Sequence, residues 1–273
     1  MFSADKMCEV ALVLCSCDHV NMEGCYWYHS VWQYLRLMNM VSTPSWHHRF
    51  YVEQISEAIK PFDNPHVLIS GAADYSSLSD AIQVIIASEK RGDFSVLDLC
   101  ETPLFACKWY AKKEDVKVHT ICCSIFDFNV INQYTLICTD AFLTRFSKND
   151  IKRVVSIWYD ALTCGGSVVT TVRIHDETHT CPDTPSEENV MLFRQKAFER
   201  SKIWGNVINY SQEQISLMEE TYARKMESNS VGSKEEILGV FHEIGFSISY
   251  LEDIEVQGEL YPSRYLRIRA TKS

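Results

Sequence analysis

Hydrophobic and polar positions are spaced in two different patterns along the chain, and the first pattern covers residues 1–61. Apolar side chains there recur every three to four positions, which predicts two amphipathic helices. A break at Ser42-Thr43-Pro44 separates the two, since Ser or Thr caps a new helix and Pro fits its first turn. The apolar faces consist of Trp27, Val31, Tyr34, Leu35 and Met38 in the first helix and of Trp46, Phe50, Ile55 and Ile59 in the second.

From Pro65 onward, short apolar runs alternate with helical patterns. The helical patterns lie around Leu78–Ile86 and Ile151–Leu162, and the second is expected to end at Gly165-Gly166. Strands and helices that alternate at this spacing predict a parallel sheet covered on both faces. The apolar runs lack polar alternation, as buried strands do, and they are Val67–Ile69, Val96–Leu99, Val118–Ile121, Leu136–Cys138 and Val168–Val172.

A polar region at 176–230 interrupts the strand pattern, and Glu187–Tyr210 is expected to be its longest helix. The pattern resumes with a helix at Ile237–Ile244, followed by strands near Phe246–Leu251 and at Tyr265–Arg269. The connection between these last strands is too short for a crossover helix, so they are predicted to pair antiparallel.

Composition and charge narrow the class of protein. A chain of 273 residues with 46% hydrophobic and 23% charged residues can bury a substantial core. The formal net charge of -10 disfavours nucleic acid as the main partner, because phosphate binding relies on clustered Lys and Arg. With no apolar run long enough to span a bilayer and no signal-peptide pattern, we expect a cytoplasmic protein without a membrane partner.

The 11 cysteines favour reduced thiols over disulfides, because their number is odd and several stand in apolar, strand-like runs. Cys15 and Cys17 form a CxC pair, and His19 and Cys25 are the other candidate ligands nearby. No second Cys/His pair stands at zinc-like spacing, so no metal site is expected.

Small and acidic residues follow the predicted strands, at the edge where open parallel sheets bind ligands. Gly71-Ala72-Ala73-Asp74 follows the first strand, and small residues there either admit a ligand close to the backbone or simply form a tight turn. Asp98 ends the second strand, where a carboxylate can accept hydrogen bonds from ribose hydroxyls. After the third strand, Ile125 or Phe126 suits the face of an adenine ring and Asp127 its exocyclic amine.

In this order the motifs resemble those of class I S-adenosylmethionine (SAM)-dependent methyltransferases. The segments are HVLISGAADYSSL, VLDLCETPL, SIFDF, YTLICTDAFLTRFS and LTCGGSVVTTVRI. The resemblance covers about residues 62–174 and resumes at 234–273, where a reversed last strand is typical of the family. The first motif departs from the family's acid-x-Gly-x-Gly-x-Gly: Ile69 stands at the acid position, Gly71 is kept, and Ala73 and Tyr75 replace the later glycines.

The resemblance implies an α/β fold, with a Rossmann-like seven-stranded sheet, an antiparallel last strand, an N-terminal helical lid and a helical insertion. The expected divisions are 1–61 for the lid, 62–175 for the SAM-binding core, 176–233 for the insertion over the acceptor pocket, and 234–273 for the C-terminal part of the core. The implied cofactor is SAM. The implied cofactor-binding residues are Gly71, Ala72, Ala73, Asp98, Leu99, Phe126, Asp127 and Asp140.

Methyl transfer requires orientation and, where the acceptor must lose a proton, a base; a carboxylate acceptor needs none. The candidate catalytic residues are Asp140, which the resemblance places beside the transferable methyl group, and the histidines His29 and His175. A single histidine is more often structural, and an arginine at a strand end is usually an ion-pair partner. The candidate substrate-binding residues are Tyr28, Trp32, His47 and Arg173.

The predicted function is therefore methyl transfer from SAM to a small molecule or short peptide, at a hydroxyl or carboxylate oxygen. The chain resembles modules of bacterial natural-product pathways, for which a homodimer or fusion to another biosynthetic domain is an open alternative. The eroded first motif supports a second hypothesis, a catalytically silent methyltransferase-like subunit that binds SAM or a partner protein. An NAD-type oxidoreductase is disfavoured by the lack of GxGxxG. Base methylation of nucleic acid is disfavoured because TDAF replaces NPPY-like or DPPY-like residues.

Overall fold

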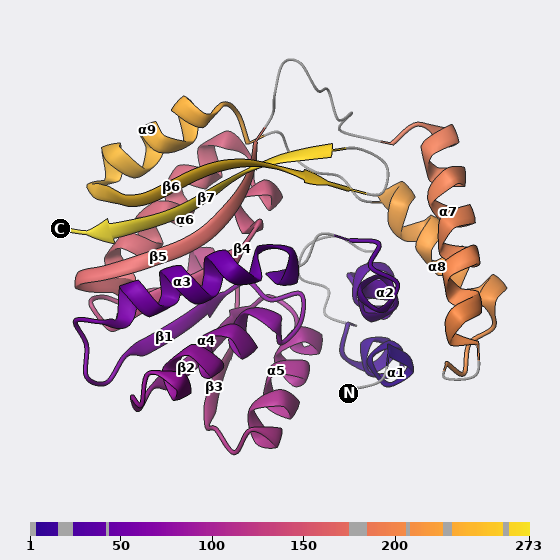
Figure 1. Ribbon diagram of the computed structural model, residues 1–273, viewed down its shortest axis with the longest axis horizontal. Helices are drawn as coiled ribbons and strands as arrows, with labels where there is room; N and C mark the ends of the chain where they lie inside the picture. The colour runs from indigo at the N-terminus through magenta and orange to yellow at the C-terminus, as the bar shows by residue number, and fades with distance from the viewer. Residues whose placement is uncertain are drawn as a thin grey trace.

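Seven strands form one sheet in the part of the chain that the structure describes, with the order β3-β2-β1-β4-β5-β7-β6 (Figure 1). The structure is a computed structural model that describes residues 4–15, 24–41, 44–174, 185–205, 208–225, 231–258 and 262–273. The strands are β1 (His66–Ser70), β2 (Asp93–Asp98), β3 (Val118–Cys122), β4 (Tyr134–Asp140), β5 (Leu162–Ile174), β6 (Phe246–Gln257) and β7 (Pro262–Lys272).

β1 to β5 pair parallel, whereas β7 runs antiparallel to both of its neighbours, β5 and β6. The link between β6 and β7 leaves no room for a crossover, as the sequence predicted. The α/β class, the seven-stranded sheet and the antiparallel last strand are thereby confirmed.

The helices cover both faces of this sheet and extend beyond one of its edges (Figure 1). None of them, within the described residues, is long and apolar enough to cross a membrane. They are α1 (Ala4–Leu14), α2 (Tyr26–Leu37), α3 (His48–Ile59), α4 (Ser76–Ala87), α5 (Glu101–Lys113), α6 (Lys148–Ala161), α7 (Glu187–Ser201), α8 (Gln212–Lys225) and α9 (Lys234–Ile244), with short 3-10 turns η1 (Pro44–His47), η2 (Ile125–Asp127), η3 (Phe142–Arg145) and η4 (Lys202–Trp204).

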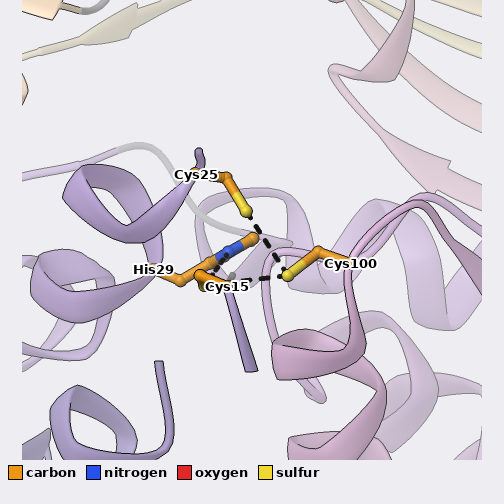
Figure 2. Close-up of side chains that lie close together, drawn as sticks. All are labelled: Cys15, Cys25, His29 and Cys100. Atoms are coloured by element: carbon orange, nitrogen blue, oxygen red, sulfur yellow. Dashed lines mark hydrogen bonds between the residues drawn. The ribbon is translucent and has the colours of Figure 1, made fainter. Parts of the chain in front are cut away.

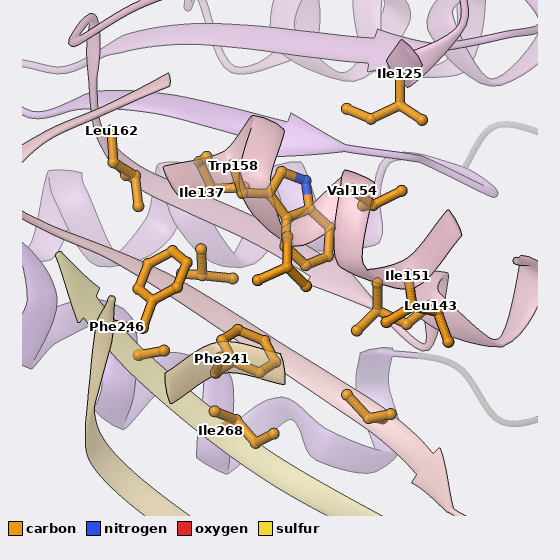
Figure 3. Close-up of a cluster of buried hydrophobic side chains, with 14 of the residues drawn as sticks. Ile125, Ile137, Leu143, Ile151, Val154, Trp158, Leu162, Phe241, Phe246 and Ile268 are labelled. Carbon is orange, nitrogen blue, oxygen red and sulfur yellow. The ribbon is translucent and has the colours of Figure 1, made fainter. Parts of the chain in front are cut away.

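Successive residues of the central strands point to opposite faces of the sheet, which divides the core into two halves. On one face Ile137 packs with Trp158 of α6 and Phe241 of α9 (Figure 3), and Leu68 belongs to the same cluster. On the other face the alternate residues of β1 and β4 pack against α3, α4 and α5. Because both faces are covered, β1 and β4 are buried along nearly their whole length, which is why the sequence shows continuous apolar runs there.

A third apolar cluster joins α1, α2, α7 and α8, which we call the cap. These four helices lie beyond the carboxyl ends of the parallel strands, on the right of Figure 1. The cap unites two segments that are far apart in the sequence, and α2 packs directly on α8. By contrast α3 packs on the sheet with α4, so within residues 1–61 the described helices that leave the sheet are α1 and α2.

Two predicted helix boundaries were wrong. α6 ends at Ala161 and the chain enters β5 directly, where Leu162 pairs with Tyr134, so the Gly165-Gly166 pair lies inside the strand. Gly165 has a φ of 76° and lies at a register shift, which a glycine accommodates. The helix expected over 187–210 ends at Ser201, because the chain turns through η4 for α8 to pack back against α7.

Candidate functional site

The strand order reverses between β1 and β4, which is where ligands bind in open α/β sheets. The turns after β1 and β2 are linked at this point. The Gly71 N–H donates to the Leu97 carbonyl at 2.8 Å, and the Ala72 N–H donates to Asp98 Oδ2 at 2.9 Å. The turn at residues 71–74, which we call the GAAD turn, and Asp98 of β2 are therefore joined by hydrogen bonds.

Glycine is the only residue type that this turn accepts at position 71 without rearrangement. Its φ is 76°, and a Cβ would lie 2.4 Å from Cδ2 of Phe142. Phe142 belongs to η3, after β4, and packs on Trp158 at a ring distance of 6.3 Å. The preceding residue, Ala141, also has a positive φ of 48°, a strained geometry of the kind that occurs at functional sites.

The Asp98 carboxylate is held by two backbone donors. Its Oδ1 accepts from the Cys100 N–H at 2.8 Å, while its Oδ2 accepts from Ala72. Burial raises the pKa of Asp98 to about 6, although both backbone hydrogen bonds lower it. Each carboxylate oxygen has a further lone pair, so the group can still accept hydrogen bonds from a ribose.

Asp140 ends β4 on the other side of the reversal. Its Oδ1 accepts hydrogen bonds from the Tyr51 hydroxyl at 2.8 Å and the Thr171 hydroxyl at 2.6 Å. Burial raises the pKa of Asp140, and these two donors counteract it. Both partners come from distant elements, α3 and β5, and sequence reasoning missed them. The sole sequence signal was the position of Thr171 at the end of an apolar strand.

Asp74 ties the GAAD turn to the cap. It is buried, and its Oδ2 accepts from Trp32 Nε1 at 2.7 Å and forms an ion pair with Arg36 at 2.7 Å. Its Oδ1 accepts from the Ser76 N–H at 2.6 Å, which starts α4. Trp32 and Arg36 are one helical turn apart on α2, so they reach the same carboxylate.

Aromatic side chains from both halves of the cap meet above the turn after β4. Tyr28 stacks on Trp32 at 5.0 Å and lies 5.8 Å from Tyr222 of α8. The Arg145 guanidinium, from η3, lies 6.0 Å from the Tyr28 ring. Arg173 is partly buried near the end of β5. Tyr222 was missed by sequence reasoning, because its helix has no motif.

The predicted histidines lie in three different places. His29 is buried, with Nδ1 3.3 Å from the Cys15 sulfur. His47 has no exposed surface, and its Nδ1 accepts from Arg267 Nε at 3.2 Å, so in this conformation it offers nothing to an acceptor. His175 lies outside the described residues. Tyr51 and Thr171, and no histidine, are the described side chains that bond to Asp140.

The predicted adenine residues lie at η2. Phe126 is partly buried, with the Arg153 guanidinium over its ring at 4.3 Å and Phe146 edge-on at 5.6 Å. Asp127 is exposed, as is Leu99 after β2. Because β2 and β3 pair parallel, Leu99 and Asp127 follow strand ends at the same edge of the sheet as Asp98.

No protein-family profile matches the chain, and no curated protein resembles it in sequence. Solved structures do resemble it. Magnesium protoporphyrin IX methyltransferase (ChlM) from Synechocystis PCC 6803 with bound SAH has a TM-score of 0.53 at 11% identity, over 91% of this chain and 97% of that one.

Two further structures are similar. The [4+2]-cyclase SpnF has a TM-score of 0.54 at 11% identity, over 85% of this chain and 83% of that one. TehB from Haemophilus influenzae has a TM-score of 0.53 at 11% identity over 81% of this chain, which spans only 62% of TehB. The chain therefore has the fold of the class I SAM-dependent methyltransferases.

Proposed function

We propose that this chain is a SAM-dependent methyltransferase that acts on a small molecule or short peptide and methylates an oxygen. The observation that carries the proposal is Asp98, which binds the backbone of the GAAD turn at the point of strand reversal. Its proposed setting in natural-product biosynthesis rests on the sequence resemblance alone.

The cofactor is proposed to lie across the ends of β1, β2 and β4. Asp98 accepts its ribose hydroxyls, and the small residues Ala72 and Ala73 admit its methionine part close to the backbone. Phe126 and Asp127 bind the adenine, and Leu99 borders it. The SAH bound in ChlM, a protein of the same fold, supports SAM as the cofactor.

The acceptor is proposed to enter between the cap and Asp140, where Tyr28, Trp32 and Tyr222 supply an aromatic wall. Two kinds of oxygen fit. A hydroxyl can give its proton to Asp140, whose Oδ1 is fixed by Tyr51 and Thr171 and whose raised pKa suits a base. A carboxylate needs no base, and its charge is complementary to Arg145 and Arg173. His29 and His175 are the remaining candidate bases, although the cysteine contact of His29 argues for a different role.

One observation favours a second candidate, the silent SAM-binding subunit. The Phe142 ring lies directly against Gly71, the one glycine of the family's first motif that this chain keeps. A catalytic protein must hold both cofactor and acceptor beside Asp140, whereas a silent one needs only the first or neither.

The test is isothermal titration calorimetry with S-adenosylhomocysteine and with NAD, on the wild type and on Asp98→Ala. Loss of two hydrogen bonds to a charged acceptor removes about 3 kcal/mol or more, so we expect Kd to rise on the order of 100-fold. Asp93→Ala, an exposed acid at the start of the same strand, is the matched control and should bind as the wild type does.

An Asp98→Ala protein with the wild-type Kd would refute the ribose assignment. Tight binding of NAD would instead indicate an oxidoreductase. If S-adenosylhomocysteine binds but no labelled methyl group reaches any hydroxyl or carboxylate acceptor in a panel of small molecules and peptides, the silent subunit is the better description.

A further inference from the structure

Four potential metal ligands converge where the cap meets the sheet (Figure 2). Cys15 directly follows α1, Cys25 is the N-cap of α2, and His29 lies in the first turn of α2. Cys100 is the N-cap of α5, immediately after β2. Cys25 and His29 are four residues apart at the start of one helix, which places them on the same face.

We propose that Cys15, Cys25, His29 and Cys100 bind one structural zinc ion that fastens the cap to the turn after β2. All four ligand atoms lie within 4.8 Å of one another. Zn–S bonds of about 2.3 Å and Zn–N bonds of about 2.0 Å in a tetrahedron put sulfurs about 3.8 Å apart and sulfur and nitrogen about 3.5 Å apart.

Three of the six ligand–ligand distances are close to those of that arrangement. The Cys15 and Cys100 sulfurs are 3.7 Å apart, and those of Cys25 and Cys100 are 3.4 Å apart. His29 Nδ1 lies 3.3 Å from the Cys15 sulfur. These separations are slightly short of the ideal values, so an ion at the centre needs only small outward movements of the side chains.

The surroundings also suit thiolates. Cys15 and Cys100 are 4% exposed and His29 is 7% exposed, so water cannot serve as their main partner. The Thr102 hydroxyl lies 3.0 Å from the Cys15 sulfur, and the Thr102 N–H donates to the Cys100 sulfur at 3.4 Å. Cys25 and Cys100 each stand at a helix N-terminus, where the helix dipole stabilises negative charge.

Hydrogen bonds to the ligands, like those of Thr102, orient the ligands of metal sites. Without an ion, three thiols and an imidazole face one another in a buried space, and thiols are only weak donors and acceptors. Zinc gives all four groups a strong partner. Since the protein supplies four ligands, no position is left for water or substrate, as in structural rather than catalytic zinc sites.

The proposed zinc site is hydrogen-bonded to a proposed cofactor-binding residue. The backbone N–H of Cys100 donates to Asp98 Oδ1, so an ion bound to the Cys100 sulfur fixes the residue that positions the Asp98 carboxylate. The other three ligands stand at the C-terminal end of α1 and at the N-terminal end of α2. Zinc therefore fixes the cap and Asp98 relative to each other, and its binding can be measured without any cofactor.

The first test uses the full chain purified under reducing conditions. Elemental analysis should find about one zinc ion per chain, and Co²⁺ should replace it with the intense visible absorption and near-ultraviolet thiolate bands of a tetrahedral site. A chain that binds neither ion specifically, or whose intact mass shows two hydrogens lost to a disulfide among these cysteines, would overturn the proposal.

Variants identify the ligands. Substituting residues that only hydrogen-bond to metal ligands already costs about 10- to 100-fold in metal affinity. Cys100→Ser and His29→Ala change a ligand itself, so they should lose more than that. His29→Cys should retain Co²⁺ with stronger thiolate bands, because a four-cysteine site also binds zinc. This variant keeps the test decisive if the others fold poorly. If His29 were not a metal ligand, a cysteine at its position would not add a thiolate band to the Co²⁺ spectrum.

Three controls should bind as the wild type does: Cys107→Ala, a buried cysteine of α5; Cys164→Ser, an exposed cysteine of β5; and Cys17→Ser, which lies outside the described residues. Metal binding that survives Cys100→Ser, or that is lost in Cys17→Ser but retained in Cys15→Ser, would overturn the ligand assignment.

Discussion

Glu219 of α8 carries a charge-burial cost that a single substitution should remove. Its side chain has no exposed surface, and neither carboxylate oxygen has a hydrogen-bond partner in the described part of the chain. Burial raises the pKa of Glu219 from 4.5 to about 8, and the charge of Arg200 only partly counteracts this. The folded protein therefore keeps the group neutral at a pH where the unfolded chain ionises it.

A raised pKa in the folded state gives stability that is fully present below pH 4.5 and is lost as the pH rises toward 8. A pH of 7 is 2.5 units above the pKa of 4.5 that the carboxyl has in the unfolded chain, and each unit corresponds to about 1.36 kcal/mol. The loss at pH 7 is thus about 3 kcal/mol. Glu219→Gln is neutral at every pH, so it should be more stable than the wild type by about this amount at pH 7.

The assay is urea unfolding, followed by tryptophan fluorescence, at pH 4.5 and pH 7. The two proteins should differ little at pH 4.5, where Glu219 is protonated in the folded state and still half-protonated in the unfolded chain. Glu199→Gln, at an exposed position paired with Lys202, is the control and should change the free energy of unfolding by less than about 0.5 kcal/mol at either pH. A gain from Glu219→Gln that is equal at both pH values would refute the reasoning, because it would not come from ionisation.

Two further substitutions probe the site itself. Gly71→Ala should lower the free energy of unfolding by about 1–3 kcal/mol in thermal denaturation, because its φ is 76° and its Cβ meets Phe142. Gly239→Ala, whose Cβ meets nothing within 4 Å in α9, should instead be neutral or stabilising, and equal losses at both glycines would contradict this explanation. Tyr51→Phe removes one donor to Asp140, so kcat should fall about tenfold or more with an unchanged Kd for S-adenosylhomocysteine. A weaker Kd with normal kcat would instead place Tyr51 in cofactor binding.

The positions of the central strands along the chain could be predicted because each of them is buried on both faces and therefore shows a continuous apolar run. Asp98 and Asp140 were found for the same reason, since they stand where such runs end. The break after Ser201 was missed because α7 and η4 keep a helical pattern, and only packing against α8 decides where the chain turns.

Long-range contacts were beyond reach for a physical reason. Cys25 and Cys100 are 75 residues apart, and Tyr51 and Asp140 are 89 apart, so no local spacing links them. Among the possible metal ligands, Cys15, Cys17, His19 and Cys25 are close together in the sequence, whereas Cys100 joins them only through the fold. His47 was judged by its polar chemistry, whereas packing against β7 leaves it fully buried.

The bond network of Asp74 also suggests how relatives of this chain could be recognised. The carboxylate joins Trp32 and Arg36 of α2 to the turn that other members of the fold build from glycines. An uncompensated loss of either the acid or the arginine would bury a lone charge. We therefore expect the three positions to covary among homologues, with Trp-x-x-x-Arg ahead of Gly-x-x-Asp. That pairing would serve as a search signature for diverged sequences that glycine-rich profiles overlook.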